Sequence, residues 1–371
     1  MQEKSENHIL LTFPSLDGRI VGKHIINKDD KKEFRIDLSS IGFGKIHDSD
    51  GYAKIVKEFT IPYGFINSFA ICDLFKNERK IRTSREILKD ILKETKFTVF
   101  GSSELEFYLT RNNKPIDQMG YFDIHSDLSK WFHDLTPHIN VMHHENGNGQ
   151  YEVGTDYGNP LEMADKSLFV KQLLEQYFYD QGIKFDDRAK PFRNDFGSGM
   201  HIHLSLKNHN EWVFGTDKMT DEMMHFIGGI CSFGLHELTL TMNNGSFSRF
   251  GEGEAPNFIS WGNSNRSAAI RVPNSNVKII EIRVPDPRCD PFLAFAILIK
   301  AGLRGIKEQI KPPNESNFNV YKKNTGLAPL PRSLGEAIKI HQENCDSILK
   351  NLLGDFYSPF LEMKKKQLLN T

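Results

Sequence analysis

Three short segments of the sequence alternate charged and apolar residues, and this pattern constrains the fold more than any other feature. They are residues 104–109 (ELEFYL), 201–206 (HIHLSL) and 280–284 (IEIRV). In a β-strand, residues two apart point to the same side. Each segment therefore predicts a strand with acids, imidazoles or an arginine on one face and apolar side chains on the other.

A solvated face of an antiparallel sheet would produce the same alternation, and for a single segment this is the simpler explanation. Solvated faces usually carry lysine, threonine and mixed charges, however, whereas these faces carry acids, imidazoles and arginine. Glycines crowd the neighbouring loops at positions 147, 149, 197 and 199, where backbone must approach another group closely. Carboxylates with a minority of histidine suit Mg²⁺ or Mn²⁺ better than zinc. Together, the segments predict a metal site.

A fourth segment, 143–152 (HHENGNGQYE), has acids on both sides of a glycine-rich loop. Alone, it would more often be a polar surface than a set of ligands. The same third of the chain as the histidine segment carries Arg249, Arg266, Arg271 and Arg283. Arginine binds carboxylate or phosphate through a planar fork and keeps its charge. Metals and arginines together favour phosphoryl transfer, which needs charge neutralisation and positioning. The residues by themselves predict metal-assisted phosphoryl transfer to a small acidic substrate.

Composition excludes several other classes of protein. The 371 residues are 39% hydrophobic and 26% charged, with a formal net charge of -1, which is typical of a globular protein and gives no indication of nucleic-acid or membrane binding. The four cysteines have no C-x-x-C spacing, which argues against a zinc ribbon or a disulfide framework. Residues 1–7 lack an apolar signal core, and the apolar run 292–299 is too short to span a bilayer. We therefore expect a cytoplasmic protein.

The order of elements predicts an α+β chain with a boundary near residue 80. A small β-rich domain (1–80) would precede a large mixed domain (81–371). The strands expected in the first domain include 8–13, 20–26 and 66–74. Thr83 and Glu86 have the spacing of a capping box at a helix start, and Asp290 followed by proline is typical of another. Helices are expected over 161–181, 220–241, 291–309 and 332–353.

The order and spacing of the motifs resemble the glutamine synthetase family over essentially the whole chain. The matching segments are 104–107 (ELEF), 145–152, 197–206 (GSGMHIHLSL), 246–249 (SFSR), 254–256 (EAP), 265–273 (NRSAAIRVP), 281–286 (EIRVPD), 291–293 (PFL) and 301–306 (AGLRGI). The resemblance implies a β-grasp-like N-terminal domain and a catalytic domain whose curved antiparallel sheet forms a funnel flanked by helices. It also implies an ATP-dependent ligase that makes glutamine from glutamate and ammonia through γ-glutamyl phosphate, with two or more Mg²⁺ or Mn²⁺ ions per site.

The resemblance assigns a role to each matching position. One ion would be held by Glu106, Glu145 and Glu152, and the other by Glu104, His201 and Glu281. The nucleotide and its phosphates would be held by His203, Ser205, Arg266 and Arg271, with Arg266 also offsetting charge during catalysis. The amino-acid substrate would be held by Arg249, Arg283 and the backbone at Gly197. Glu254 would be the flap glutamate that closes over the acyl phosphate.

The ammonium pocket is implied to form between subunits. Asp37 would bind and deprotonate ammonium in a neighbouring subunit's site, although by itself this residue would indicate only a turn. The pocket would be completed by Ser40, Tyr121 and Glu145. The resemblance therefore implies a ring-like homo-oligomer, for which the family precedent is two stacked hexamers.

The chain departs from the family pattern at a few positions, and two alternative functions stay open. Phe196 replaces an asparagine, Ile279 an arginine, Leu38 a glycine and Gly245 an asparagine, and the flap loop is one residue short. Phe196 and Leu38 leave open a γ-glutamyl–amine ligase that uses methylamine, a polyamine or a similar amine. A non-catalytic scaffold is the other alternative, although no expected metal ligand is lost. Residues 324–327 lack the tyrosine that some relatives use for adenylylation, so we expect no such control.

Overall fold

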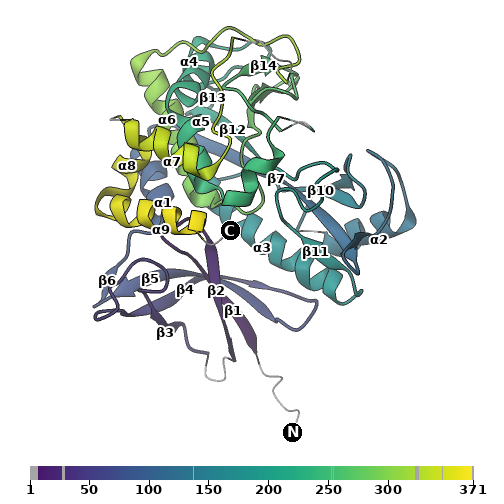
Figure 1. Ribbon diagram of the computed structural model, residues 1–371, viewed down its shortest axis with the longest axis vertical. Coiled ribbons are helices and arrows are strands. Elements are labelled where there is room, and N and C mark those ends of the chain that lie inside the picture. Colours follow the sequence, from purple (N-terminus) through teal and green to yellow (C-terminus); the bar gives the residue numbers. More distant parts are fainter. Residues whose placement is uncertain are drawn as a thin grey trace.

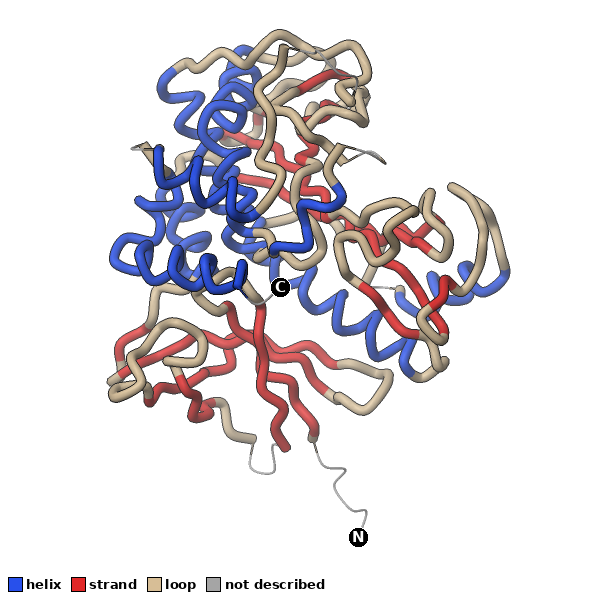
Figure 2. Tube along the Cα trace, in the orientation of Figure 1, coloured by secondary structure: helices blue, strands red, loops and turns tan. Residues whose placement is uncertain are grey.

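The computed structural model describes residues 7–26, 30–136, 138–251, 253, 255–321, 326–344 and 346–369. It contains two β-sheets and a set of helices that pack mainly around the second sheet (Figures 1 and 2). Both sheets and helices are present in one chain, as the predicted α+β class requires. No helix of the described residues is both long enough and apolar enough to cross a membrane.

The first sheet is built from the N-terminal part of the chain. Its strands are β1 (His8–Pro14), β2 (Ile20–Ile26), β3 (Glu33–Asp37), β4 (Asp50–Thr60), β5 (Ser68–Lys76) and β6 (Arg79–Lys80). They lie in the order β2-β1-β5-β4-β3, with β6 paired to β5. β1 runs antiparallel to β2 and parallel to β5. The sheet ends at Lys80, and the division of the chain into two domains at this point stays a prediction.

The second sheet carries the segments with alternating charge. Its strands are β7 (Thr98–Arg111), β8 (Lys114–Pro115), β9 (Val141–His144), β10 (Gln150–Gly154), β11 (Lys184–Asp186), β12 (Met200–Asn208), β13 (Glu211–Trp212), β14 (Trp261–Asn263), β15 (Ile270–Val272) and β16 (Ile280–Ile282). The order is β14-β15-β16-β12-β7-β10-β9. The long strand β7 lies between β12 and β10 and runs antiparallel to both.

The register of this sheet brings the polar residues together. Glu104 on β7 pairs with His201 on β12, and Glu106 pairs with Glu152 on β10. The alternate residues of β7, such as Leu105 and Phe107, are buried in the hydrophobic core. Glu106 and Glu152 are each only 8% exposed, and His201 is 4% exposed. The explanation of the alternation by a solvated face is therefore wrong, because the polar face is itself buried.

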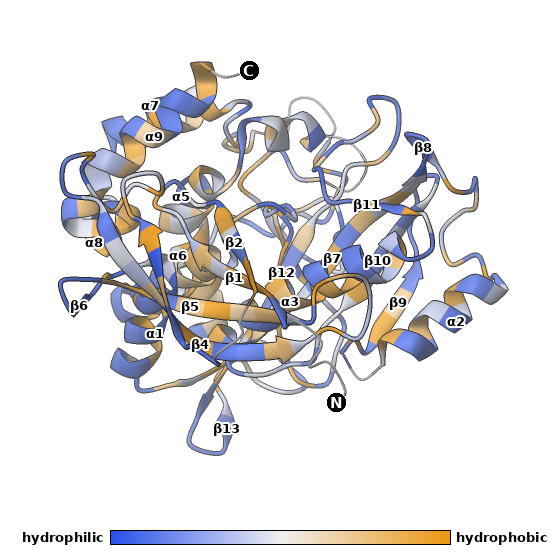
Figure 3. Cartoon of the chain, turned by 90° about the horizontal axis from the view of Figure 1, so that it is seen from below, coloured by the Kyte–Doolittle hydropathy of each residue, from blue (hydrophilic) through white to orange (hydrophobic). Residues whose placement is uncertain are grey.

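The helices pack on the second sheet, and one of them also contacts the first sheet. They are α1 (Ser84–Glu94), α2 (Ser126–Leu135), α3 (Pro160–Tyr179), α4 (Asp221–Gly229), α5 (Leu235–Leu238), α6 (Pro291–Glu308), α7 (Leu334–Glu343), α8 (Ile348–Leu353) and α9 (Tyr357–Leu369). α3 packs along β7 and also contacts β5 of the first sheet, and α6 packs against α1 and α4. In Figure 3, hydrophobic colour marks much of β5 and β12, while the outer turns of α1 and α2 are hydrophilic.

Some local predictions are confirmed and others are wrong. Asp290 caps α6 by accepting hydrogen bonds from the backbone N–H groups of Phe292 and Leu293. Thr83 is the N-cap of α1, but its side chain makes no capping bond among the described residues. The capping box is wrong because Glu86 instead pairs with Lys80, at 2.6 Å.

Two predicted helices differ in their continuity. The helix expected over 220–241 is divided by a π-helical turn (Ile230–Gly234) between α4 and α5 and ends in a 3₁₀ turn (Thr239–Thr241). The single helix expected over 332–353 is wrong. α7 ends at Glu343, and α8 begins after Ser347, whose side chain accepts from the N–H of Lys350 and starts a new helix.

Candidate active site

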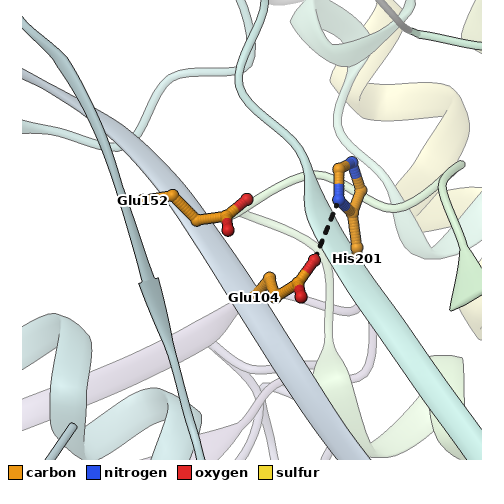
Figure 4. Close-up of side chains that lie close together, drawn as sticks. All are labelled: Glu104, Glu152 and His201. Atoms are coloured by element: carbon orange, nitrogen blue, oxygen red, sulfur yellow. Dashed lines mark ion pairs between the residues drawn. The ribbon is translucent and has the colours of Figure 1, made fainter. Parts of the chain in front are cut away.

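His201 lies at the centre of the buried polar face. Its Nδ1 atom is 3.4 Å from a carboxylate oxygen of Glu104 and 3.5 Å from one of Glu281. Its Nε2 atom is 3.5 Å from an oxygen of Glu106. Figure 4 shows Glu104, Glu152 and His201, from three neighbouring strands, pointing toward one another. The side chains that the sequence predicted to converge therefore do so.

Two groups of side chains among the described residues have the spacing to hold a metal ion. One is Glu104, Glu152 and His201, and the other is His143, Glu145 and Glu152, with the potential ligand atoms of each group within 4.8 Å of one another. Glu152 belongs to both groups. Oxygen donors with a minority of imidazole are the set that fits Mg²⁺ or Mn²⁺. The donor chemistry therefore fits the ions that the sequence implies.

Two expected ligands, Glu106 and Glu281, are not in these groups, whereas His143 is added and Glu152 belongs to both. Glu106 accepts a hydrogen bond from the N–H of Gly199, at 2.7 Å. Each carboxylate oxygen of Glu281 is paired with an arginine, one with Arg271 and the other with Arg283. Glu281 is therefore neutralised by protein cations here, and the assignment of individual ligands stays a prediction.

The electrostatics of the groups reflect crowded, buried carboxylates. Burial raises the pKa of Glu145 to about 8, and the neighbouring charges of Glu106 and Glu152 act in the same direction. Burial and the charges of Glu104 and Glu106 also hold the pKa of Glu152 well above its ordinary value. Burial opposes ionisation of Glu104 as well, but the charges and hydrogen bonds of His203 and His201 hold its pKa well below the usual range. A bound cation would relieve the repulsion between these acids.

A cavity of about 400 Å³ opens beside the two groups. Its walls are Glu104, Glu106, Tyr121, Phe122, Val141, Met142, His143, Glu145, Glu152, His201, Arg266 and Arg271. Arg266, Arg271 and Tyr121 therefore line the same cavity as the acids, and their roles stay predictions. A larger cavity of about 660 Å³ lies between α1, α6 and α8. Most of its charged groups pair with one another, as Arg304 does with Asp346 at 2.5 Å, so it offers less to a polyanion.

His143 was not assigned a role from the sequence. Its Nε2 atom is 3.0 Å from Glu152, and its Nδ1 atom is 3.7 Å from Glu145. The rings of Tyr121 and Phe122 stack at 4.0 Å, and both meet the His143 ring edge-on. His143 could have been predicted from the sequence, because it stands two residues from Glu145. The same spacing of two residues led to the prediction of the other acids.

The other residues expected on the nucleotide and amino-acid sides are buried. Among the described residues, the cavity wall includes none of them, namely His203, Ser205, Gly197, Arg249 and Arg283. The Nε2 atom of His203 is 3.2 Å from Glu104, and the hydroxyl of Ser205 donates to the carbonyl of Lys278 at 3.0 Å. Arg249, 2% exposed, donates to the backbone carbonyl of Val284 at 2.9 Å. A Cβ atom at Gly197 would lie 2.5 Å from the Cβ of Arg249, so glycine is needed at 197 for this close approach.

Two of the four residues expected in the ammonium pocket, Asp37 and Ser40, are not among the described residues that form the cavity wall of their own chain. Asp37 ends β3, is exposed, and accepts hydrogen bonds from the N–H and hydroxyl of Ser39. The hydroxyl of Ser40 donates to the carbonyl of Asp37. In Figure 1, β3 lies at the far edge of the first sheet from β10. Within the described chain, the cavity walls include neither Asp37 nor Ser40.

The predicted flap glutamate, Glu254, lies outside the described residues. Its neighbour Gly253 has a φ of +54°, in the left-handed region that favours glycine. A Cβ atom at this position would lie 2.9 Å from the ring of Phe196. Phe196, one of the departures from the family pattern, therefore packs against the loop that carries the predicted flap.

Comparisons with known proteins identify the family of the chain. Residues 81–371 match the model of the glutamine synthetase catalytic domain. The chain belongs to the glutamine synthetase family. It is 34% identical to the glutamine synthetase of Pyrococcus woesei over 362 residues, which is 89% of this chain and 82% of that protein. It is 32% identical to the glutamine synthetase of Methanocaldococcus jannaschii over 335 residues, 80% of this chain and 73% of that protein.

Solved structures of the glutamine synthetase type share the fold. A GmaS/ADP complex matches with a TM-score of 0.86 at 22% identity, covering 100% of this chain and 94% of that chain. Plasmodium falciparum glutamine synthetase, solved by cryo-electron microscopy, matches with a TM-score of 0.82 at 20% identity, covering 99% and 94%. At these identities the likeness is one of fold. Membership of the glutamine synthetase family implies the use of ATP and a divalent metal, which agrees with the donor set of the cavity.

Proposed function

We propose that this chain is an ATP-dependent glutamate–ammonia ligase that forms glutamine through a γ-glutamyl phosphate intermediate. The observation that carries the proposal is one cavity lined by two candidate cation sites and by Arg266 and Arg271. Transfer of a phosphoryl group to a carboxylate brings several negative charges together, and positioned cations offset them. The curated relatives named glutamine synthetase support the same reaction.

The residues of the chain would divide the work of the first step. When bound, Mg²⁺ or Mn²⁺ would neutralise the phosphates and the developing charge of the transferred group. The candidate ligands Glu104, Glu145, Glu152 and His201 would hold these ions. Arg271 would break its ion pair with Glu281 and donate hydrogen bonds to a phosphate group. Arg266, which lines the same cavity, would also donate to phosphate. The phosphorylation turns the γ-carboxylate of glutamate into a good electrophile.

The other assigned residues would position the reactants. His203 and Ser205 on β12 would bind the nucleotide side, and Arg249, Arg283 and Gly197 would hold glutamate. In the second step, ammonia attacks the γ-glutamyl phosphate and releases phosphate. Glu254 would close over the acyl phosphate and keep water from competing.

We propose that Asp37 acts in the site of a neighbouring subunit of a ring-like homo-oligomer. Asp37 and Ser40 lie outside the cavity of their own chain, while Tyr121 and Glu145 line it. A carboxylate is the group needed to bind ammonium and to take its proton. If the site takes Asp37 from a second subunit, a single chain cannot complete it.

Mixing inactive subunits tests this arrangement. Asp37→Ala and Arg266→Gln should each abolish glutamine formation, because each removes one half of every site. Dissociating and reassembling the two variants together should restore activity in about a quarter of the sites, those with intact residues from both subunits. The control is a mixture of Asp37→Ala with the double variant that carries both Asp37→Ala and Arg266→Gln. It should restore no activity, because no subunit then supplies Asp37. A strictly monomeric but active enzyme would refute the role of Asp37.

Phe196 favours a second candidate, a γ-glutamyl–amine ligase with the same acyl-phosphate chemistry. Its ring packs against Gly253, beside the loop that would close over the intermediate, and a changed wall there suits a bulkier nucleophile. Purified protein should be offered glutamate and ATP with ammonium, methylamine or a polyamine in parallel. Phosphate release with ammonium supports glutamine formation, whereas release with the other amines alone supports this second candidate. No turnover with any amine, and no binding of Mn²⁺, would indicate a non-catalytic scaffold.

A further inference from the structure

Asp117 is a hydrogen-bonding centre behind the candidate metal site. It follows β8, and its side chain is 19% exposed. Its Oδ1 atom accepts hydrogen bonds from the N–H of Met119 at 3.1 Å and the N–H of Gly149 at 3.2 Å. The same oxygen is 2.9 Å from Nε2 of His144, and Oδ2 accepts from the hydroxyl of Tyr151 at 2.5 Å. One carboxylate therefore joins three separate segments of backbone.

Two of these segments carry the candidate ligands. His144 lies between His143 and Glu145, and its Nδ1 atom is 2.6 Å from the carbonyl oxygen of Glu145. The fully buried His144 ring lies between the Asp117 carboxylate and the Glu145 carbonyl, with one ring nitrogen directed at each. The contacts of Asp117 with His144, and of His144 with the carbonyl of Glu145, therefore hold the backbone at Glu145 in place.

The second path leads to Glu152. Gly149 and Tyr151 lie on both sides of the start of β10, and Tyr151 directly precedes Glu152. The Tyr151 ring is itself buried against Trp131 at 5.5 Å. Its hydroxyl donates to Asp117 at 2.5 Å and also lies 3.2 Å from Nε2 of His125. A displaced Tyr151 would therefore move Glu152 with it.

The third segment is the turn that holds the aromatic cap. Met119 and Gly120 lead into Tyr121 and Phe122, whose stacked rings meet His143. The N–H of Gly120 donates to the carboxylate of Asp123 at 2.7 Å, which closes the turn. Asp117 thus anchors both the ligands and the rings above them. Within the described residues, it does not line the cavity.

We propose that Asp117 is a positioning residue that sets the spacing of Glu145 and Glu152 and thereby the affinity of the site for divalent cations. This inference rests on the ion binding that the proposed function requires. Residues that orient metal ligands commonly contribute tenfold to hundredfold in affinity, and a carboxylate that accepts several hydrogen bonds has the rigidity for this role. Burial opposes its ionisation, but the hydrogen bonds of His144 and Tyr151 lower the pKa of Asp117 to about 2.

Direct binding of Mn²⁺ to the full-length protein tests the proposal. Asp117→Asn keeps the shape of the side chain but replaces one acceptor oxygen by a donor, and we expect it to weaken Mn²⁺ binding by roughly tenfold or more in calorimetric titration. Tyr151→Phe removes the single bond to Oδ2 and should give a smaller loss. If Asp117→Asn does not fold, Tyr151→Phe decides, and unchanged Mn²⁺ affinity in that variant would overturn the proposal.

Asp165 provides a matched control. It is a buried aspartate on α3 that accepts two hydrogen bonds from Arg85, each at 2.9 Å. Asp165→Asn should lower the urea midpoint of unfolding while leaving Mn²⁺ affinity within about twofold of the wild type. Equal losses of Mn²⁺ affinity in Asp117→Asn and Asp165→Asn would show a general loss of structure and overturn the positioning role.

The wild-type measurements separate this inference from the proposed function. A wild-type chain that binds Mn²⁺ but turns over neither ammonium nor other amines would refute the ligase and leave the comparison between variants valid. A wild-type chain that binds no Mn²⁺ would overturn both. Normal turnover with unchanged Mn²⁺ affinity in Asp117→Asn would refute only the role of Asp117.

Discussion

Glu237 and His341 form a buried pair of titratable groups beneath α8, and their pH dependences should oppose each other. The Nδ1 atom of His341 is 4.0 Å from the carboxylate of Glu237. That carboxylate accepts from the N–H groups of Ile348 and Leu349, at 2.9 and 2.6 Å. Burial raises the pKa of Glu237 to about 7 despite these hydrogen bonds. Burial, helped by the charge of Lys350, lowers the pKa of His341 to about 4.

The direction of each effect follows from which state binds the proton more tightly. The pKa of Glu237 is raised from 4.5, so its contribution to stability is fully present below pH 4.5 and is lost as the pH rises through 7. The pKa of His341 is lowered from 6.5, so its contribution is present above pH 6.5 and is lost as the pH falls through 4. Each difference is about 2.5 pH units, or about 3 kcal/mol at 1.36 kcal/mol per unit. Between pH 4.5 and 6.5 the two effects therefore nearly cancel.

Replacing one member of the pair should reveal the effect of the other on the pH dependence of stability. Glu237→Gln resembles the protonated carboxyl group. Relative to the wild type, its free energy of unfolding in urea should rise by about 3 kcal/mol from pH 4.5 to 6.5, because within the pair only the histidine then titrates. His341→Gln should show a fall of similar size over the same range. Both profiles are compared with that of the wild type, because other carboxyl groups with a raised pKa, such as Glu145, titrate over the same range and contribute equally to all three proteins. Slopes of the same sign in both variants, or a flat profile in both, would refute the assignment.

Three further substitutions test the site and its frame. His143→Gln should weaken Mn²⁺ more than Mg²⁺ in calorimetric titration, because a nitrogen ligand favours Mn²⁺; an unchanged ratio would mean that His143 only hydrogen-bonds Glu152. Gly253→Ala should raise the KM for glutamate by contact with the Phe196 ring, and adding Phe196→Ala should recover part of the loss, because the unfavourable φ remains. An unimproved double variant would exclude that contact. Arg85→Gln leaves a buried carboxylate of α3 without its two-bond partner and should cost about 3–5 kcal/mol in urea unfolding, with Mn²⁺ affinity unchanged.

The convergence of the acids could be predicted from the sequence because the side-chain period of a strand is fixed by geometry. Alternation in residues 104–109 and 201–206 places one side of each strand in the site, whatever the partner strands are. The family motifs then indicated which side chains share a site, and the pairing of β7 with β12 places Glu104 opposite His201. The α+β class followed from the same elements.

Contacts that depend on tertiary neighbours could not be predicted in this way. The capping box at Thr83 fails because Lys80, from β6, takes the carboxylate of Glu86. The pairing of Glu281 with two arginines and the contacts of Asp117 join segments that are distant along the chain. Helix periodicity across 332–353 gives no sign of the cap at Ser347, because the apolar spacing continues through the break. The roles of individual site residues stay predictions for the same reason.

The antiparallel pairing of β7 with strands on both of its edges makes the length of this segment a hard constraint on evolution and on engineering. An insertion of one residue ahead of Glu104 would turn Leu105 and Phe107 into the cavity and drive the carboxylates into the hydrocarbon core. Substitutions in this segment that keep the alternation of polar and apolar residues preserve both faces, whereas gains or losses of single residues exchange them. Libraries that vary chain length belong in the loops between the strands, where the alternation of the sheet is unaffected.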